Sequence, residues 1–299
     1  MRRLLLVFLL FVFQFHHALS QERGDILVSE ILFNPIPGGS DYVELYNASD
    51  KAISLNTLRL ARMDDSTIVK LFAIADSGVF NPHDYLVVTT DAAFVSGNYI
   101  VRFPAKMLEV KSMPSYNDAS GIVVVCTSDS LILDRLDYNE KMHSRLLRDR
   151  EGVALERRSF QAATQDASNW YSAATTAGYG TPTYANSQSH ELLFLDNDFV
   201  VSTPLFSPDG DGYNDLLDIT YSLDQCDLSA NVTIYDPAGH LVRHLLRGAL
   251  IGCSGDLTWD GADDDGRRMP RGKYVVFIEV FNDNGVKQSW RHTVSLVRK

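Results

Sequence analysis

The sequence has 299 residues, 45% of them hydrophobic, and a formal net charge of −11 at pH 7. This length is typical of two domains, and this hydrophobic content is enough for ordinary packed cores. The negative charge disfavours nucleic acid and anionic membrane surfaces as partners, because phosphate binding needs stripes of Lys and Arg. The charge instead suits a soluble exported protein, or one that holds cations.

Residues 1–20 have the pattern of a secretory signal peptide. Arg2 and Arg3 precede an apolar run over 4–15, and Ala18-Leu19-Ser20 forms a small-x-small cleavage site. The alternative is an uncleaved anchor, but this run is shorter than the roughly 20 residues that span a bilayer. We therefore expect a mature chain that begins near Gln21, contains no membrane span, and lies in the periplasm, on the outer-membrane surface or outside the cell.

After residue 24 the chain alternates short apolar runs with turn signals, and sustained helical periodicity is hard to find. Segments 61–65 and 141–149 are interpreted as short turns or loops. This pattern predicts an all-β sandwich or barrel. The predicted strands cover 26–33, 41–46, 68–74, 85–90, 122–127 and 131–138.

Several motifs in the first half occur in the order found in lamin tail domains. Their sequences are Ile31–Pro35, Asp41–Asn47, Gly152–Arg157, Asn169-Trp170 and Gly180–Asn186, the last with Thr183 where the family usually has Gly. Residues 24–187 therefore resemble a lamin tail domain, and the resemblance implies an Ig-like β-sandwich.

The last hundred residues contain two turn segments rich in Asp and Gly, Phe206–Asp215 and Trp259–Gly266. Strand-like runs over 231–235 and 273–280 lie between and after them. The pattern resembles the FlgD-type Ig-like domain of flagellar hook-capping proteins, and also the C-terminal modules of proteins exported by gliding bacteria. It implies a second Ig-like β-sandwich over 198–299, joined to the first by a linker at 188–197. A further alternative is that this module is a type IX-like export signal.

The best candidate cation site is the segment Asp209-x-Asp211-x-Tyr213-x-Asp215. Alternate residues can direct three carboxylates and the Tyr213 backbone carbonyl toward one centre, as Ca²⁺ loops do. The alternative is a turn whose Asp side chains accept bonds from backbone amides. The second Asp-rich segment, around Asp260 and 263–265, is interpreted as a solvated hairpin tip.

The three cysteines divide between the two predicted modules. Export exposes Cys226 and Cys253, which share the second module, to oxidising conditions, and we predict a disulfide between them. Cys126 is then a buried thiol in the strand at 122–127. The competing picture leaves all three thiols free.

Sequence motifs of known catalytic centres are absent: there is no G-x-S-x-G, no H-E-x-x-H and no P-loop. Glu30 and Glu44 could lie on adjacent strands and act as an acid–base pair. The structural alternative is that they accept bonds from backbone amides and lock the turn at Asn34-Pro35. Likewise, Tyr42, Tyr46 and Trp170 could stack on a sugar, or could be core and cross-strand residues.

The sequence therefore predicts a protein that is not an enzyme. We expect an exported bacterial envelope or surface protein that works in binding, scaffolding or adhesion, with an unknown protein or glycan partner. Contacts would be made through loops or exposed sheet edges. The alternative is an accessory or cryptic hydrolase subunit. Beyond the candidate Ca²⁺, no cofactor is expected.

Overall fold

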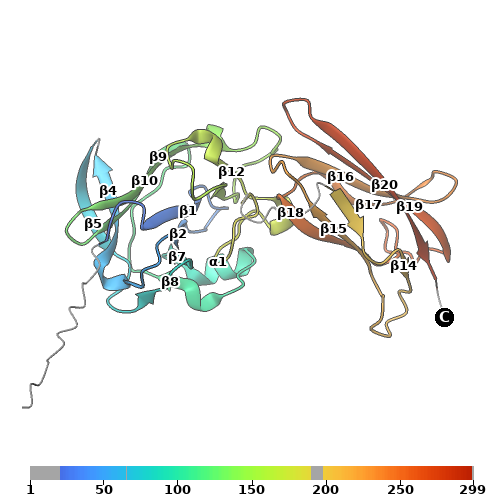
Figure 1. The fold of residues 1–299 in the computed structure, drawn as a ribbon, viewed down its shortest axis with the longest axis horizontal. Helices are drawn as coiled ribbons and strands as arrows, with labels where there is room; N and C mark the ends of the chain where they lie inside the picture. The colour runs from blue at the N-terminus through green and yellow to red at the C-terminus, as the bar shows by residue number, and fades with distance from the viewer. Residues whose placement is uncertain (1–20, 65, 190–197, 298–299) are drawn as a thin grey trace, which may run out of the picture.

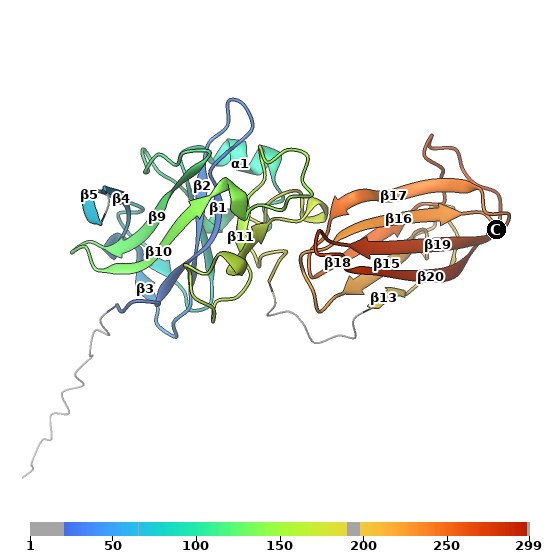
Figure 2. The ribbon, with the colours of Figure 1, turned by 90° about the horizontal axis from the view of Figure 1, so that it is seen from above.

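The computed structural model describes residues 21–64, 66–189 and 198–297. The predicted signal peptide and most of the predicted linker lie outside these residues. The described chain forms two β-rich modules that lie end to end along the long axis of the molecule (Figures 1 and 2). The all-β fold predicted from the sequence is confirmed.

Two packed sheets form the first module. The larger contains β12 (Trp170–Ser172), β11 (Leu155–Arg157), β1 (Ile26–Leu32), β2 (Tyr42–Asn47), β7 (Tyr85–Thr89) and β8 (Met107–Glu109), in that order. The smaller contains β10 (Ile132–Asn139), β9 (Ser120–Thr127), β4 (Leu58–Asp64) and β5 (Thr67–Ala73). A short pair, β3 (Ile53–Ser54) and β6 (Val79–Phe80), completes the module.

The larger sheet is buried on both faces. Alternate residues of β1 and β2, such as Ile31 and Val43, face the smaller sheet and form the main core. The residues between them face the opposite side, where Leu32 and Tyr42 pack with Tyr99 in a second cluster. The helix α1 (Ala92–Asn98) contributes Val95 to this cluster. Polar side chains in the centre of this second face are therefore also removed from water.

The second module is a sandwich of three and five strands. The smaller sheet has the order β13 (Asp198–Val201), β15 (Leu217–Ser222) and β18 (Ser254–Trp259). The larger has β14 (Leu205–Phe206), β20 (Lys287–Leu296), β19 (Gly272–Phe281), β16 (Ser229–Tyr235) and β17 (Leu241–Leu250). Its core is built around Trp259, whose ring packs near those of Phe206 and Tyr274.

The six predicted strands of the first module, and the two at 231–235 and 273–280 of the second, coincide with observed strands to within a few residues. The interpretation of 61–65 as a turn is wrong, because β4 continues to Asp64. The pairing of β4 with β5 shifts between Arg62 and Met63, and this bulge interrupts the alternation by which strands are recognised. Within the described part of the chain, no helix is long and apolar enough to cross a membrane.

Candidate functional site

Three glutamates meet on the second face of the larger sheet of the first module. Glu30 lies on β1, directly opposite Glu44 on β2 and Glu156 on β11. The period of two in a strand points all three side chains to the same face, and each is 0% exposed. Buried carboxyl groups need hydrogen-bond donors, and these come from residues 180–188, which we call the strap.

Each glutamate accepts hydrogen bonds from the strap. The backbone amide of Thr181 donates to Glu30 at 3.0 Å, and that of Thr183 donates to Glu44 at 2.6 Å. Glu156 accepts from the backbone amide of Gln188 at 2.9 Å. The expectation that Glu30 and Glu44 lock the nearby Asn34-Pro35 turn is therefore wrong, since their donors lie about 140 to 150 residues further along the chain.

The first residue of the strap must be small. A Cβ on Gly180 would lie 2.6 Å from the Tyr42 hydroxyl and 3.2 Å from Glu30 Oε1. The Tyr42 hydroxyl itself donates to Glu30 Oε1 at 2.5 Å. The glycine thus lets the backbone approach the buried carboxyl closely enough for the Thr181 amide to reach it.

Burial favours the uncharged form of these carboxyl groups. Loss of hydration, together with the neighbouring Glu156, raises the pKa of Glu30 to about 8. Loss of hydration also raises the pKa of Glu44 and of Glu156. Two carboxyl groups on adjacent strands can act as acid and base, but these face a strap that covers them.

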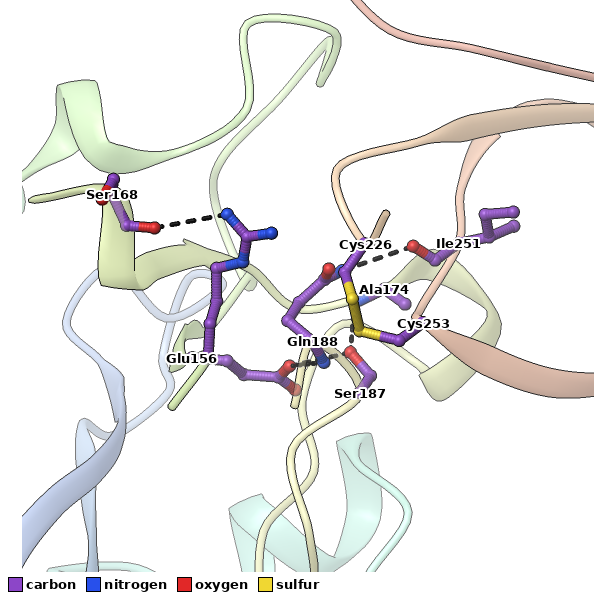
Figure 3. Close-up of a disulfide and its surroundings, with 9 residues drawn as sticks. Glu156, Ser168, Ala174, Ser187, Gln188, Cys226, Ile251 and Cys253 are labelled. Carbon is purple, nitrogen blue, oxygen red and sulfur yellow. Dashed lines mark hydrogen bonds between the residues drawn. A yellow bond between two sulfur atoms is a disulfide. The ribbon is translucent and has the colours of Figure 1, made fainter. Parts of the chain in front are cut away.

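The end of the strap also contacts the second module. The backbone amide of Cys253 donates to the carbonyl oxygen of Ser187 at 3.0 Å. The side chain of Gln188 donates to the carbonyl oxygen of Ile251 at 3.4 Å. Figure 3 shows Ser187 and Gln188 between Glu156 on one side and Ile251 and Cys253 on the other. Gln188, which lies in the linker predicted from the sequence, is fully buried, and the exact domain boundaries stay a prediction.

A disulfide lies at this junction. Cys226 follows β15 and Cys253 precedes β18, and the structure joins them, as predicted, with a Cα–Cα distance of 4.3 Å. Cys126 is a buried free thiol, and burial raises its pKa to about 11. The disulfide therefore braces the loop that carries Ile251 and Cys253 to the strap (Figure 3).

A groove of about 780 Å³ opens beside the junction. One wall is the loop at 146–153 of the first module, and the other is the edge strand β17 with Phe281 of β19. Apolar side chains mix with charged ones along it. The lining residues are Leu146, Leu147, Arg148, Asp149, Glu151, Val153, Thr175, Tyr179, Ser229, Arg247, Gly248, Ala249, Leu250 and Phe281. Because each module forms one wall, the groove exists only when the two modules are held together.

The predicted Ca²⁺ loop lies away from this junction, in the second module. One oxygen from each of Asp209, Asp211 and Asp215 falls within 4.8 Å of the others. The same carboxylates accept bonds from backbone amides: Gly210 and Gly212 donate to Asp215, and Tyr213 donates to Asp211. The geometry thus contains both the carboxylate cluster and the capped turn that the sequence left as alternatives.

The Asp-rich segment near Asp260 forms ion pairs. Asp264 bonds His244 at 3.0 Å and Arg247 at 2.9 Å, and Asp260 bonds Arg243 at 3.1 Å. It is therefore tied to β17 and is more than the solvated tip that the sequence suggested.

The three aromatic residues that could stack on a sugar serve as packing residues. Tyr42 and Trp170 are buried, and the Trp170 indole donates to the carbonyl oxygen of Thr164. Tyr46 stacks on Phe160 with ring centroids 3.8 Å apart. This supports the core and cross-strand alternative.

Two family models match the chain in the order of the two modules. The Lamin Tail Domain model matches residues 20–140, and the FlgD Ig-like domain model matches residues 210–284. The first module thus contains a match to the lamin tail domain, and the second a match to the FlgD Ig-like domain. The strap and β11, which hold the buried carboxyl groups, lie beyond the matched part of the lamin tail domain. No curated protein matches the chain.

Solved structures show partial likenesses. FlgD from P. aeruginosa is 22% identical and matches 33% of this chain and 67% of its own, with a TM-score of 0.24. Latent PorU from Porphyromonas gingivalis is 10% identical over 92% of this chain, with a TM-score of 0.28. PorZ, from the same organism, is 14% identical over 91%, with a TM-score of 0.26. The chain spans only 20% of PorU and 30% of PorZ. Such low identities and TM-scores give no basis for transferring a function.

Proposed function

We propose that this protein is an exported, non-catalytic binding or scaffolding protein of the bacterial envelope, whose two modules act as one unit. The observation that carries the proposal is the backbone bond between Ser187 and Cys253. Together with the Gln188–Ile251 bond, it couples the lamin tail domain directly to the FlgD Ig-like domain. A fixed orientation suits a protein that presents surfaces to a partner, since pre-organised surfaces lose less entropy on binding.

The buried carboxyl groups support the non-catalytic part of the proposal. Glu30, Glu44 and Glu156 are fully buried and accept bonds from the strap. A general acid or base must come within hydrogen-bond reach of a substrate, and these groups are covered by backbone. Their arrangement therefore suits the attachment of the strap better than chemistry on a substrate.

The groove between the modules is the surface we assign to the partner. A photoreactive amino acid at Leu147, in the groove, would be compared with one at Val69, an exposed position on β5. Crosslinking on intact cells, followed by mass spectrometry, should give an adduct from Leu147 that is absent from Val69. Equal crosslinking from both positions, or turnover of esterase, phosphatase, nuclease or glycosidase substrates by the purified chain, would contradict the proposal.

A further inference from the structure

In the buried layer beneath the strap, one hydroxyl group lies between two carboxyl groups. Thr181 Oγ1 is 2.7 Å from Glu156 Oε1 and 3.0 Å from Glu30 Oε2. A threonine hydroxyl has one hydrogen and can donate to only one acceptor at a time. With both glutamates ionised, one contact would bring two lone pairs together. One of the two carboxyl groups must therefore supply a second hydrogen.

The surrounding bonds indicate which group carries it. Glu156 makes the shorter contact with Thr181, and its other oxygen accepts from the Ser187 hydroxyl at 2.8 Å and from the Gln188 amide at 2.9 Å. Three donors directed at one carboxyl group favour its ionised form. Glu30 can then donate from Oε2 to Thr181, while its Oε1 accepts from the Tyr42 hydroxyl and the Thr181 amide, which are two donors against the three on Glu156. These hydrogen bonds form a continuous row of three side chains, which runs from Glu30 through Thr181 to Glu156.

The titratable groups around this row would not compensate a negative charge on both Glu30 and Glu156. The titratable groups that act on Glu30 or on its partners are acidic or phenolic: Tyr42, Glu44, Tyr99, Glu156 and Tyr184. Arg102 lies over the Tyr184 ring at 4.2 Å. Arg157 follows Glu156, but its guanidinium bonds Asp134 and the carbonyl oxygen of Val28. Burial of two uncompensated charges is costly, so one proton is expected to remain.

We propose that Glu30 is a protonated carboxylic acid in the folded protein at neutral pH, and that this proton fastens the strap to the sheet. The raised pKa of Glu30, about 8, agrees with this assignment. As the pH rises through this value, a second charge develops beneath the strap. Ser187 and Gln188 bond both Glu156 and the second module. The junction between the modules should therefore loosen together with the strap under weakly alkaline conditions.

The variant Glu30→Gln tests the proposal, because an amide can replace the protonated acid as both donor and acceptor. Hydrogen exchange of the Thr181, Thr183 and Gln188 amides would be measured in the full chain from pH 6 to pH 9 and corrected for intrinsic exchange rates. Protection in the natural protein should fall by up to roughly tenfold for each pH unit between the ordinary carboxyl pKa of 4.5 and the raised value of about 8, and it should level off above pH 8. In Glu30→Gln the fall should be shallower, because only the titration of Glu44 and Glu156, whose pKa values are also raised, then remains linked to the strap. Glu22→Gln, an exposed control, should behave like the natural protein.

Carbon NMR of the side-chain carboxyl groups provides the second measurement and needs no variant that must fold. The Glu30 resonance should titrate near pH 8. Titration of Glu30 together with the exposed carboxyl groups would overturn the proposal, and so would a Glu30→Gln protein whose strap keeps the pH dependence of the natural chain.

Discussion

The carbonyl oxygen of Ser187 and the backbone of Gly252 are in direct contact across the junction of the two modules. A Cβ on Gly252 would lie 2.5 Å from this oxygen, closer than packed atoms allow. The next residue, Cys253, donates its amide to the same oxygen at 3.0 Å. The two modules therefore meet backbone to backbone, at a place where only glycine fits.

Gly252→Ala should push the modules apart. The added methyl group clashes with a backbone atom, which cannot move aside as a side-chain tip can, and the cost should be about 1–3 kcal/mol. Small-angle X-ray scattering should show a changed distance distribution and urea unfolding a lower stability. Gly272→Ala is the matched control, because a Cβ there has nothing within 4 Å. An unchanged scattering profile in Gly252→Ala would show that the modules are not held by this contact.

Replacing both disulfide cysteines with serine should destabilise the second module. Cys226 and Cys253 are separated by 27 residues, and closing a loop of this size contributes roughly 3–4 kcal/mol in the chain-entropy model. Denaturant unfolding measures the loss, and Cys126→Ala serves as a control outside the bond. Peptide mapping without reductant, on protein from its native compartment, should recover the Cys226–Cys253 pair. Recovery of Cys126 in a disulfide would contradict this arrangement.

The sequence was sufficient for the two-module β fold but not for the site. Alternation of apolar residues identified β1 and β2, and it placed Glu30 and Glu44 on adjacent strands. It could not show that the donors come from Thr181 and Thr183, because contacts between distant segments leave no periodic signal. The motif that ends at Asn186 was visible only through the family resemblance. The physical role of this motif is to bond the strap to the buried carboxyl groups, and only the structure showed this role.

The helix α1 was missed for a related reason. It has seven residues, too few for a clear helical period, and it includes Gly97. Its start is set by Asp91, whose side chain accepts from the Phe94 amide at 2.8 Å. A single capping residue is a weak signal without a periodic run behind it.

Asp134→Ala should cost several kcal/mol. Its carboxylate accepts from Arg157 at 3.2 Å and from the Val28 amide at 2.9 Å, and it joins the two sheets of the first module. Arg157 is 2% exposed, so removal of Asp134 leaves a buried cation without its partner, at a cost of about 3–5 kcal/mol. Asp137→Ala breaks the more exposed pair with Arg135 and should cost less than about 1 kcal/mol. Equal losses in urea unfolding would refute this difference.

Calcium should raise the melting temperature through Asp209, Asp211 and Asp215. Ligand binding to the native state alone stabilises by mass action, by about 2.7 kcal/mol at one hundred times the dissociation constant. Asp211→Asn should reduce the shift, whereas Asp265→Asn, in the other Asp-rich segment, should leave it intact. Calorimetry that detects no heat at millimolar Ca²⁺ would remove the site and leave the capped turn as the role of these residues.

His143 should contribute to the change in the free energy of unfolding at acidic pH. It is buried beside the Phe33 ring, and its Nδ1 lies 2.8 Å from the Ser172 hydroxyl. Loss of hydration, with a smaller effect of Arg150, lowers its pKa to about 4, against an ordinary value of 6.5. Between these values the unfolded chain binds more protons at this histidine than the folded chain does, so the contribution of His143 to the free energy of unfolding should fall as the pH drops from 6.5 toward 4.

The loss should approach about 3 kcal/mol, at about 1.4 kcal/mol per pKa unit. His143→Asn should flatten this pH dependence in urea unfolding between pH 7 and pH 4, because asparagine does not titrate. His83→Asn, at an exposed histidine that bonds Asp50, should keep the slope of the natural protein. The same slope in all three proteins would assign the acid sensitivity to other groups. The buried glutamates act with the opposite sign, since a raised carboxyl pKa weakens the fold as the pH rises.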